Sequence, residues 1–340
     1  MTLEPNAIQQ LQGAGIPTKV SQIRASGKNP VWELIGVLQL AFWLIRLRPN
    51  VLHTVSPKGN LYGGILARIL LIPRLVQAVS GMGFLFTGDV RGFKAAVGRV
   101  YTAVLGWVRR HPDIHVIVQN EVDRYEALAS GVPAPCVSLI PGSGVDLAHF
   151  RPPPAQRERN MVLLPARVLW DKGIGEYVAA AKVLAPEFPR WRWALAGVAD
   201  YANPAAVPMT QLEEWTREGP VEWLGHVENM PELMGATGIV CLPSYREGMP
   251  KVLLEAAACG CAVVTTDVTG CREAIIPDVT GLLVPARDVN ALVAALRVLL
   301  SDASLRRSMG EAGRRLAVER FGINAVIQRT LALYEMEIRE

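Results

Sequence analysis

The sequence predicts an α/β protein of two domains, each built on a parallel β-sheet covered by helices. Short apolar runs alternate with helical patterns along almost the whole chain, which is the arrangement that parallel sheets require. A length of 340 residues allows two separate cores. Residues 151–160 have the stiff, polar, proline-rich composition of a linker. We therefore expect domains at 1–150 and 161–322 on either side of this linker, and a closing helix at 323–340.

The composition excludes several classes of protein. Half of the residues are hydrophobic and 19% are charged, so the chain is globular and not disordered. Up to residue 150 it holds 14 Lys and Arg against 8 Asp and Glu, and after it 21 against 23. A basic first half favours an anionic surface or ligand, such as membrane phospholipid or a lipid diphosphate. We expect no nucleic-acid partner, because no basic patch interleaved with aromatic residues is present.

The cysteines and the start of the chain indicate a reducing compartment. An odd number of cysteines without a framework argues against disulfides. The spacing of Cys259 and Cys261 is wrong for a zinc site, and no His pair accompanies them. No cleavable signal peptide is expected, because the basic–apolar–small pattern is missing. We expect buried thiols at Cys136, Cys241, Cys259, Cys261 and Cys271.

The first domain opens with a short helical pattern at 7–14 and a candidate strand at 16–20. The run at 31–45 is the most apolar in the chain. It is shorter than a bilayer span requires, and Glu33 and Gln39 interrupt it. We therefore expect a buried or interfacial helix here rather than a transmembrane one.

Strands and helices alternate through the rest of the first domain. We expect strands at 51–55, 74–79, 114–118 and 137–140, with helices at 59–71, 91–110 and 121–130. The helix at 91–110 joins an apolar side to several cations, among them Arg109 and Arg110, and to Trp107. This pattern fits a helix on an anionic membrane and equally a helix docked on its own sheet with solvated charges.

The loop at 80–88 leaves the end of a strand and is rich in glycine and phenylalanine. It does not match the dinucleotide-binding pattern G-x-G-x-x-G. Ligands of parallel sheets lie at the carboxyl ends of strands. The loop is therefore a candidate contact for a second substrate, and a plain packing loop is the alternative. The residues concerned are Ser80, Gly81, Met82 and Gly83.

The second domain has the clearer alternation. We expect strands at 161–166, 191–197, 221–227, 238–243, 262–267 and 280–285. We expect helices at 174–184, 210–218, 288–300, 302–320 and 324–339, and a further helix that begins at Pro250. Proline suits the first helical position, since its missing N–H has no partner there in any case.

The stretch 245–256 holds the most informative pattern. Glu247 and Glu255 stand eight residues apart across the turn that joins the strand at 238–243 to its helix. The unbonded amides of a helix start and the positive end of its dipole form a seat for phosphate. Gly248 allows close approach of the backbone to a ligand. Carboxylates bind sugar hydroxyls well, because a charged acceptor strengthens each hydrogen bond.

Two cations follow the first strand of this domain. Arg167 and Lys172 lie in the loop after 161–166, at the strand end where a nucleotide diphosphate binds in such sheets. Arginine holds phosphate through its fork and lysine as a point charge. By themselves the two residues are also compatible with ordinary solvated charges.

Taken together, these patterns resemble the family 4 glycosyltransferases of the GT-B fold. The resemblance rests on the two glutamates in E-x7-E spacing, the cation pair in register before them, and the run 140–150, which is similar to the family's inter-domain segment. The phrases at 60–63, 80–84 and 244–251 resemble the subgroup that acts on polyprenyl-diphosphate-linked glycans. The resemblance implies a retaining transfer from a UDP-sugar to a lipid-linked acceptor, in polysaccharide or glycan biosynthesis. It also implies a cytoplasmic enzyme held peripherally on the inner face of the membrane.

The resemblance assigns a role to each candidate residue. Arg167, Lys172 and the amides near Met249 and Lys251 stabilise the departing diphosphate, Glu247 orients the donor sugar and Glu255 holds the ribose. A strand end at 225–227 packs against the base. The donor-binding set is Gly225, His226, Val227, Gly248, Met249, Pro250, Lys251, Val252 and Glu255. Neither a cofactor nor a metal is expected, since no D-x-D pair is present to hold a divalent ion.

Two departures from the family's pattern keep other readings open. Ser80 stands where many members have a His, and the family's opening strand, glycine-rich loop, helix and strand have no counterpart before Met1. One alternative is a sugar-nucleotide epimerase of GT-B fold, which needs an acid–base pair around the sugar C2. The other is a non-catalytic remnant that binds a nucleotide sugar.

Overall fold

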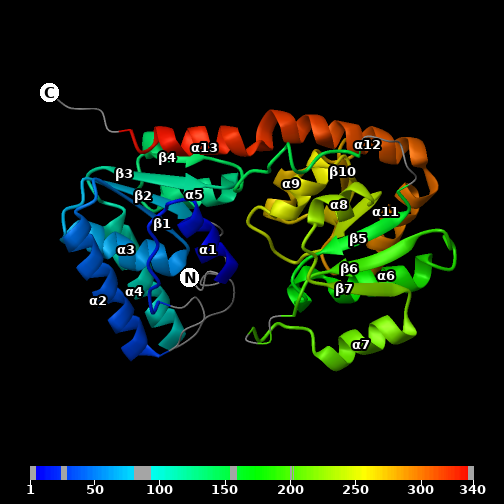
Figure 1. Ribbon diagram of the computed structural model, residues 1–340, viewed down its shortest axis with the longest axis horizontal. Coiled ribbons are helices and arrows are strands. Elements are labelled where there is room, and N and C mark those ends of the chain that lie inside the picture. Colours follow the sequence, from blue (N-terminus) through cyan, green and yellow to red (C-terminus); the bar gives the residue numbers. More distant parts are fainter. Residues whose placement is uncertain are drawn as a thin grey trace. The chain divides into compact units, whose positions relative to one another are not determined.

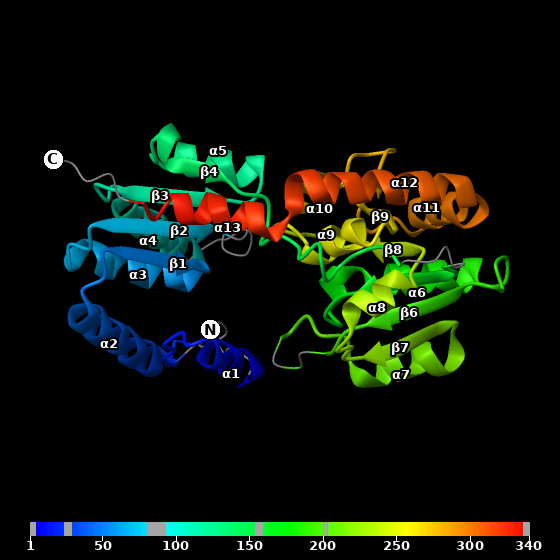
Figure 2. The same cartoon turned by 45° about the horizontal axis from the view of Figure 1, so that its top comes forward.

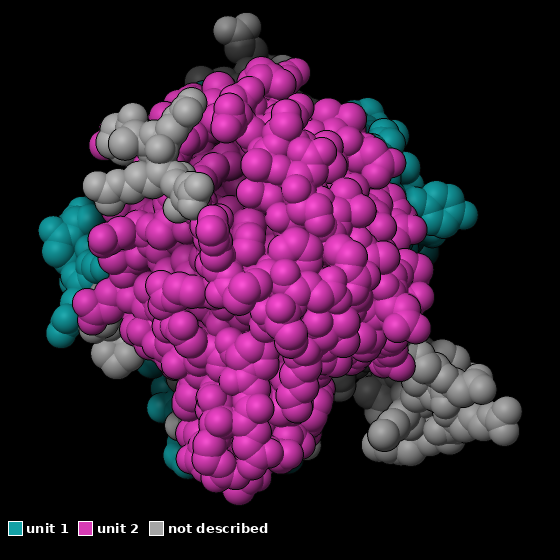
Figure 3. Space-filling model, turned by 90° about the vertical axis from the view of Figure 1, so that its right-hand side faces the viewer, with its two compact units in different colours: residues 1–139, 333–340 teal, residues 140–332 magenta. Residues whose placement is uncertain are grey.

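The computed structural model describes residues 5–23, 29–79, 93–153, 159–199, 201 and 203–335. Their contacts divide the chain into two compact units, coloured separately in Figure 3. Unit 1 comprises residues 1–139 and 333–340, and unit 2 comprises residues 140–332. Each unit contains one all-parallel sheet with helices packed on it (Figure 1), so the predicted α/β class with two parallel sheets is confirmed.

Unit 1 is built on a four-stranded sheet in the order β1-β2-β3-β4. The strands are β1 (Val51–Val55), β2 (Arg74–Val79), β3 (Ile114–Val118) and β4 (Val137–Leu139). The helices are α1 (Pro5–Gly13), α2 (Pro30–Leu47), α3 (Pro57–Ile69), α4 (Phe93–Val108), α5 (Glu121–Ala129) and the short η1 (Ala134–Cys136). The strands follow one another across the sheet in chain order, so the part of it that the structure describes contains no reversal of direction.

The core of unit 1 joins the strands to helices α3, α4 and α5. Leu66 of α3, Val108 of α4 and Ala127 of α5 belong to one buried cluster with alternate strand residues such as Val116. Gly63 of α3 lies so close to β1 that a Cβ atom there would come within 2.5 Å of the Thr54 Cγ2 atom. Side chains at alternate positions of a strand point to opposite faces. These three helices therefore share one face of the sheet.

Helix α4 packs on this sheet, which supports the docked alternative for the pattern at 91–110. Leu105 and Val108 are buried in the core, and Arg109 is buried as well and donates to the Ser130 hydroxyl. The guanidinium of Arg68 lies 4.5 Å from the ring centroid of the half-exposed Trp107. Side chains of residues 93–100 lie outside the description, so the helix is characterised only in its second half.

One prediction for the start of the chain is wrong. Residues 16–20 form no strand. Instead the segment 19–23 runs along α2, where the Gln22 amide donates to the Gln39 Oε1 atom at 3.3 Å and Lys19 lies over the Trp43 ring. Of the two alternatives predicted for the run at 31–45, the buried helix is not observed, since only Gly36 and Leu44 of the 18 residues of α2 are fully covered.

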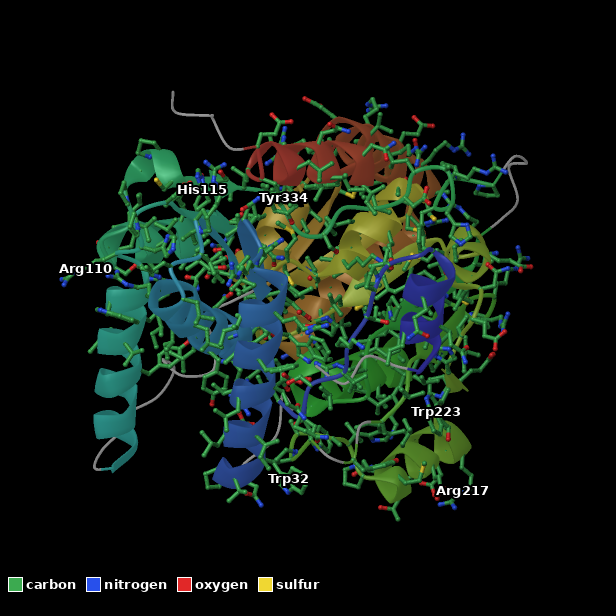
Figure 4. The ribbon with its side chains drawn as sticks, turned by 60° about the vertical axis from the view of Figure 1, so that its left-hand side comes forward. Trp32, Arg110, His115, Arg217, Trp223 and Tyr334 are labelled. Atoms are coloured by element: carbon green, nitrogen blue, oxygen red, sulfur yellow. The ribbon has the colours of Figure 1, made fainter. Side chains whose placement is uncertain are left out.

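A segment from the far end of the chain completes unit 1. Residues 333–335 cluster with this unit, although α13 (Ile323–Ala332) before them clusters with unit 2. The Tyr334 hydroxyl lies 2.5 Å from the His53 Nδ1 atom. Arg74 donates to the carbonyl of Leu333 at 3.1 Å and also to that of Glu335. Tyr334 is labelled in Figure 4.

Unit 2 is built on a six-stranded sheet in the order β10-β9-β8-β5-β6-β7. The strands are β5 (Met161–Pro165), β6 (Arg192–Ala196), β7 (Val221–Gly225), β8 (Ile239–Leu242), β9 (Ala262–Thr266) and β10 (Gly281–Val284). The helices are α6 (Ile174–Leu184), α7 (Met209–Glu218), α8 (Met230–Gly235), α9 (Lys251–Ala258), α10 (Thr269–Ala274), α11 (Val289–Ser301), α12 (Ala303–Leu316) and α13, with short helical segments η2 (Trp170–Lys172) and η3 (Ala317–Phe321).

Helices cover both faces of this second sheet, as Figure 2 lets the reader follow. Val162 and Leu164 of β5 belong to a core with α6 and α11. Met161 and Leu163, which alternate with them, belong to a second core with α9, α10 and η3. Strands buried on both faces consist of continuous apolar runs. This explains why the strands of unit 2 were recognisable in the sequence.

Candidate active site

The sheet of unit 2 reverses its direction between β5 and β8. From β5 the chain proceeds to β6 and β7 on one side, and from β8 to β9 and β10 on the other. The helices that follow β5 and β8 lie on opposite faces, because Ile174 of α6 and Leu253 of α9 belong to different cores. Where two loops part in this way, a crevice opens at the carboxyl ends of the strands, and ligands of doubly wound folds bind there.

The two predicted site segments meet at this reversal. Arg167 and Lys172 lie in the loop after β5, and residues 243–250 form the loop after β8. The Tyr245 amide donates to the Asp171 carbonyl at 2.8 Å, so the backbones of the two loops are directly bonded. Lys172 and Glu247 are 75 positions apart in the sequence. The two segments meet because β5 and β8 are neighbours in the sheet.

Two glycines allow this close approach. Gly173 has a φ of +70°, and a Cβ atom there would stand 2.1 Å from the Pro243 carbonyl oxygen. A Cβ atom on Gly270, at the start of α10, would stand 2.1 Å from the Gly248 carbonyl oxygen. Neither position has room for a side chain, and Gly173 also has a left-handed backbone that favours glycine. The loop that carries Glu247 is therefore held from two sides.

Lys172 and Glu247 form an ion pair in the crevice. The Lys172 Nζ atom donates to the Glu247 Oε1 atom at 2.6 Å, and the side chains are only 16% and 13% exposed. The buried Ser244 hydroxyl donates to the same Oε1 atom at 2.8 Å. Both bonds end on one oxygen, so the carboxylate is fixed in orientation. The two residues were predicted to have separate roles, and no pattern in the sequence indicates their direct contact.

Tyr245 anchors the same loop to α6. Its hydroxyl donates to the Glu176 Oε1 atom at 2.6 Å, and the Arg287 guanidinium lies 4.4 Å from its ring centroid. Burial and the bond to Glu176 raise the pKa of Tyr245 to about 12, so the phenol stays neutral. Tyr245 belonged to a phrase used in the resemblance, but neither Glu176 nor Arg287 carried any sequence signal.

Helix α9 begins at Lys251 and presents Glu255 from its second turn. Pro250 is the N-cap with a ψ of 108°, so the prediction that it occupies the first helical position is wrong by one residue. The amides of Lys251 and Val252 have no acceptor within the helix, which makes them available to an anion. Met249 precedes them and packs against Gly142. A Cβ atom on Gly142 would lie 2.9 Å from the Met249 Cγ atom.

Glu255 is a buried acid. Its Oε1 atom lies 3.3 Å from the Nζ atom of Lys251, which is one helical turn earlier and largely exposed. Burial raises the pKa of Glu255, and the positive charge of Lys251 opposes this rise. A buried carboxylate gains from hydrogen bonds to its charged form. Hydroxyl donors of a ligand at this position would therefore stabilise it.

The other predicted residues lie in the loop after β5, at the end of β7 or outside the described residues. Arg167 is exposed in the loop after β5. Gly225, with a φ of +63°, ends the edge strand β7, and the exposed His226 and half-buried Val227 follow it. Since β7 is two strands from β5, these residues are about 10 Å along the same edge. The predicted acceptor contacts Ser80, Gly81, Met82 and Gly83 lie outside the described residues.

The thiols near the site are buried and protonated. Cys271 at the start of α10 is fully covered, and burial raises its pKa to about 12 despite hydrogen bonds from Thr265 and Thr266. Cys241, Cys259 and Cys261 are buried and free as well, whereas Cys136 is half-buried. Burial also raises the pKa of Cys241, Cys259 and Cys261, so none of the four buried thiols is available as a thiolate nucleophile at neutral pH. Among the described residues, no group of three or more His, Cys, Asp or Glu is placed to hold a metal ion.

Comparisons with known families match both halves of the chain. The family described as "Glycosyl transferases group 1" matches residues 146–316, and "Glycosyl transferase 4-like domain" matches residues 2–143. The first match contains the whole reversal between β5 and β8 together with Arg167, Lys172, Glu247 and Glu255.

Two proteins similar over most of the chain are also glycosyltransferases by name. The chain is 28% identical to N,N'-diacetylbacillosaminyl-diphospho-undecaprenol alpha-1,3-N-acetylgalactosaminyltransferase of Campylobacter jejuni, over 97% of this chain and 89% of that protein. It is 22% identical to the capsular polysaccharide biosynthesis glycosyltransferase CapM of Staphylococcus aureus, over 91% of this chain and 82% of that protein.

Solved structures confirm the fold. Anabaena Alr3699/HepE, crystallised in complex with UDP and glucose, superimposes with a TM-score of 0.79 at 19% identity, over 98% of this chain and 89% of that one. Sucrose-phosphate synthase from Thermosynechococcus elongatus superimposes with a TM-score of 0.73 at 25% identity, over 88% of this chain and 76% of that one. The architecture of two Rossmann-like domains expected for GT-B proteins is therefore confirmed.

Proposed function

Because the chain belongs to the group 1 glycosyl transferases and is a glycosyltransferase, we propose that it transfers a sugar from a UDP-sugar to a polyprenyl-diphosphate-linked glycan. The observation that carries this proposal is the arrangement at the reversal of the unit 2 sheet. There Lys172 of the loop after β5 pairs with Glu247 of the loop after β8, and α9, which follows the second loop, begins without a side-chain cap and carries the buried Glu255. The UDP and glucose bound in the HepE crystal structure, and the diphospho-undecaprenol acceptor in the name of the Campylobacter enzyme, support this choice of substrates.

The reaction poses a problem of charge. As the bond between the anomeric carbon and the diphosphate breaks, negative charge grows on the diphosphate and positive character on the sugar ring. Positive groups fixed beforehand stabilise this charge at the point where it forms. In this proposal Lys172 and Arg167 act on the diphosphate together with the amides of Lys251 and Val252. Lys172 then exchanges part of its contact with Glu247 for the phosphate.

The carboxylates act on the two sugars of the donor. Glu247, held by Ser244 through its Oε1 atom, directs its second oxygen to the hydroxyls of the transferred sugar. Glu255 accepts hydrogen bonds from the ribose, and Gly225, His226 and Val227 line the place of the base. Transfer proceeds with retention, by attack on the face that the diphosphate leaves. No metal or cofactor takes part in this proposal.

The site of action follows from the acceptor. A polyprenyl chain resides in a bilayer, so the enzyme works as a peripheral protein at the inner face of the cytoplasmic membrane. Its product extends a glycan for a cell-surface polysaccharide or glycoprotein.

The test uses radiolabelled UDP-sugars and a polyprenyl-diphosphate glycan embedded in vesicles. We expect one UDP-sugar to give labelled lipid and free UDP in equal amounts, in the presence of a chelator, with the donor's anomeric configuration kept in the product. Glu247→Gln keeps the fold and abolishes transfer. An isomerised nucleotide sugar would instead identify an epimerase, and nucleotide binding without turnover would identify a non-catalytic remnant.

A further inference from the structure

Helix α2 of unit 1 is apolar on two sides. Its inner side packs against the core through Leu44, with Val37, Leu40 and Ala41 beside it. Its outer side carries a second series of large apolar residues that are 57–61% exposed. Their spacing of three and four residues places them on a single face of the helix. This outer stripe consists of Val31, Leu34, Leu38, Phe42 and Ile45.

Glu33 and Gln39, the polar residues of α2 before Arg46, face the protein and leave the outer stripe without charge. Glu33 pairs with Lys58 of α3 at 2.6 Å and its side chain is only 14% exposed. Gln39 accepts a hydrogen bond from the Gln22 backbone. A helix on the surface of a soluble domain normally has charged residues on its outer face. A contiguous exposed apolar stripe of this length marks an interaction surface.

Cations flank the stripe. Arg46 and Arg48 are exposed at the end of α2, and the Nζ atom of Lys19 lies 4.9 Å from the ring centroid of Trp43. Within the described segments 5–23 and 29–50 the single acidic residue is Glu33, which is paired. A second copy of this face would therefore bring cations against cations. An anionic phospholipid surface, by contrast, complements both the apolar stripe and its charged margin.

We propose that α2 lies in the interface of an anionic bilayer, with the outer stripe at the level of the acyl chains and Lys19, Arg46 and Arg48 at the lipid phosphates. This inference rests on the proposed function, which requires an acceptor in the membrane. Trp32, 54% exposed in the first turn of the helix, adds an aromatic anchor, and Figure 4 labels it there. Tryptophan is favoured at the boundary between lipid and water.

The helix lies in the plane of the membrane and does not cross it. By length and composition its 18 residues are sufficient for a span. At 1.5 Å per residue, however, they extend only about 27 Å against a hydrocarbon core of about 30 Å. Crossing would also remove Leu44 from the core of unit 1 and break the pair between Glu33 and Lys58. Peripheral insertion keeps all of these contacts.

The same ion pair orients the helix. It sets the start of α2 beside the start of α3, which follows the carboxyl end of β1. Substrates of parallel sheets are bound at that edge. A lipid-linked acceptor that emerges from the bilayer near Val31 and Trp32 thus presents its diphosphate at the edge of the sheet where chemistry takes place.

The first experiment measures co-sedimentation of the full chain with vesicles. We expect binding to vesicles with about one third phosphatidylglycerol, and a tenfold or larger loss in Leu38→Glu/Phe42→Glu. Val298→Glu is the matched control, since Val298 is 49% exposed on α11 of unit 2, and it should bind as the wild type does. Arg46→Gln/Arg48→Gln should weaken binding to anionic vesicles about fivefold per cation and leave binding to zwitterionic vesicles unchanged.

A second measurement leaves the stripe intact. The fluorescence of Trp32 is the difference between the emission of the wild type and that of Trp32→Phe. Brominated lipids in the vesicles should quench this fluorescence. Equal binding by the Leu38→Glu/Phe42→Glu variant and the wild type, or an unquenched Trp32, overturns the proposal. So does a concentration-dependent dimer that this variant abolishes without vesicles, because it assigns the stripe to a second copy.

Transfer to a water-soluble acceptor with a short prenyl chain separates this inference from the proposed function. The Leu38→Glu/Phe42→Glu variant should keep that transfer and lose only transfer to the acceptor in vesicles. If the wild type transfers to neither acceptor, the proposed function fails, and vesicle binding still decides the role of α2.

Discussion

Each unit holds a half-buried Lys–Glu ion pair of 2.6 Å, and the two pairs differ in their place in the fold. Lys58 and Glu33 join two helices on one side of a sheet whose described strands advance without reversal. Lys172 and Glu247 join the two loops that part where the other sheet reverses. The chemistry of the pairs is the same. Under the proposed function, their positions relative to the strand order assign a structural role to the first pair and a catalytic role to the second.

The largest difference is expected when the lysine of each pair is removed. Lys172→Ala should lower kcat by about 10²–10³, because a fixed positive group facing the departing diphosphate is lost. Lys58→Ala should leave kcat within about twofold and lower the free energy of unfolding by about 1–3 kcal/mol, since Glu33 stays buried without its partner. Rates of UDP release and urea denaturation measure the two effects. If both substitutions lowered kcat equally, the two ion pairs would not differ in their roles.

A glycine in each unit gives the next largest effect, with opposite signs. Gly173→Ala introduces a Cβ atom against the Pro243 carbonyl and a side chain at a φ of +70°. We expect a loss of about 3 kcal/mol in the free energy of unfolding, from overpacking and backbone strain together. Gly106→Ala in α4 meets no atom within 4 Å and should stabilise unit 1 by up to about 1 kcal/mol. Denaturation curves of both variants provide the test.

The buried acid of unit 2 predicts a pH dependence. Because the pKa of Glu255 is raised in the folded protein, its contribution to stability is present at low pH and declines as the pH rises through that pKa. Ribose hydroxyls would favour the charged form, so affinity for UDP should increase over the same pH range. Glu255→Gln should flatten both profiles and weaken UDP binding about tenfold at neutral pH. Calorimetry at several pH values checks this, and an unchanged profile contradicts it.

The smallest effect concerns the contact that completes unit 1. Tyr334→Phe removes the bond to His53 and should lower the free energy of unfolding by about 1 kcal/mol without changing the affinity for UDP. Burial lowers the pKa of His53, so the neutral imidazole forms this bond at neutral pH. Thermal denaturation with and without UDP separates the two quantities.

The sequence was most informative where burial alone determines the structure. β5 and β8 are covered on both faces, so their apolar runs were visible without knowledge of any partner. The prediction of a strand at 16–20 was wrong for the opposite reason. The segment was a candidate strand, but its own contacts with α2, such as that of Lys19 with Trp43, determine its path.

Candidate site residues could be chosen from the sequence, but their contacts with one another could not. Arg167, Lys172, Glu247 and Glu255 were identified from strand ends and spacing, since these are local properties. The bond between Lys172 and Glu247 joins residues 75 positions apart, and the bond between Tyr245 and Glu176 spans 69. Such contacts follow from the order of strands in the sheet, which no local pattern specifies.

Unit 1 is assembled from two separate parts of the chain, since residues 333–335 return to His53 and Arg74. A fragment ending at residue 139 thus lacks the partners of that imidazole and that guanidinium. Expressed alone, it should be recovered in poor yield, and a synthetic peptide that contains Leu333, Tyr334 and Glu335 should rescue it by complementation. Dissection of this enzyme into halves consequently calls for a fusion that rejoins its last residues to its first domain.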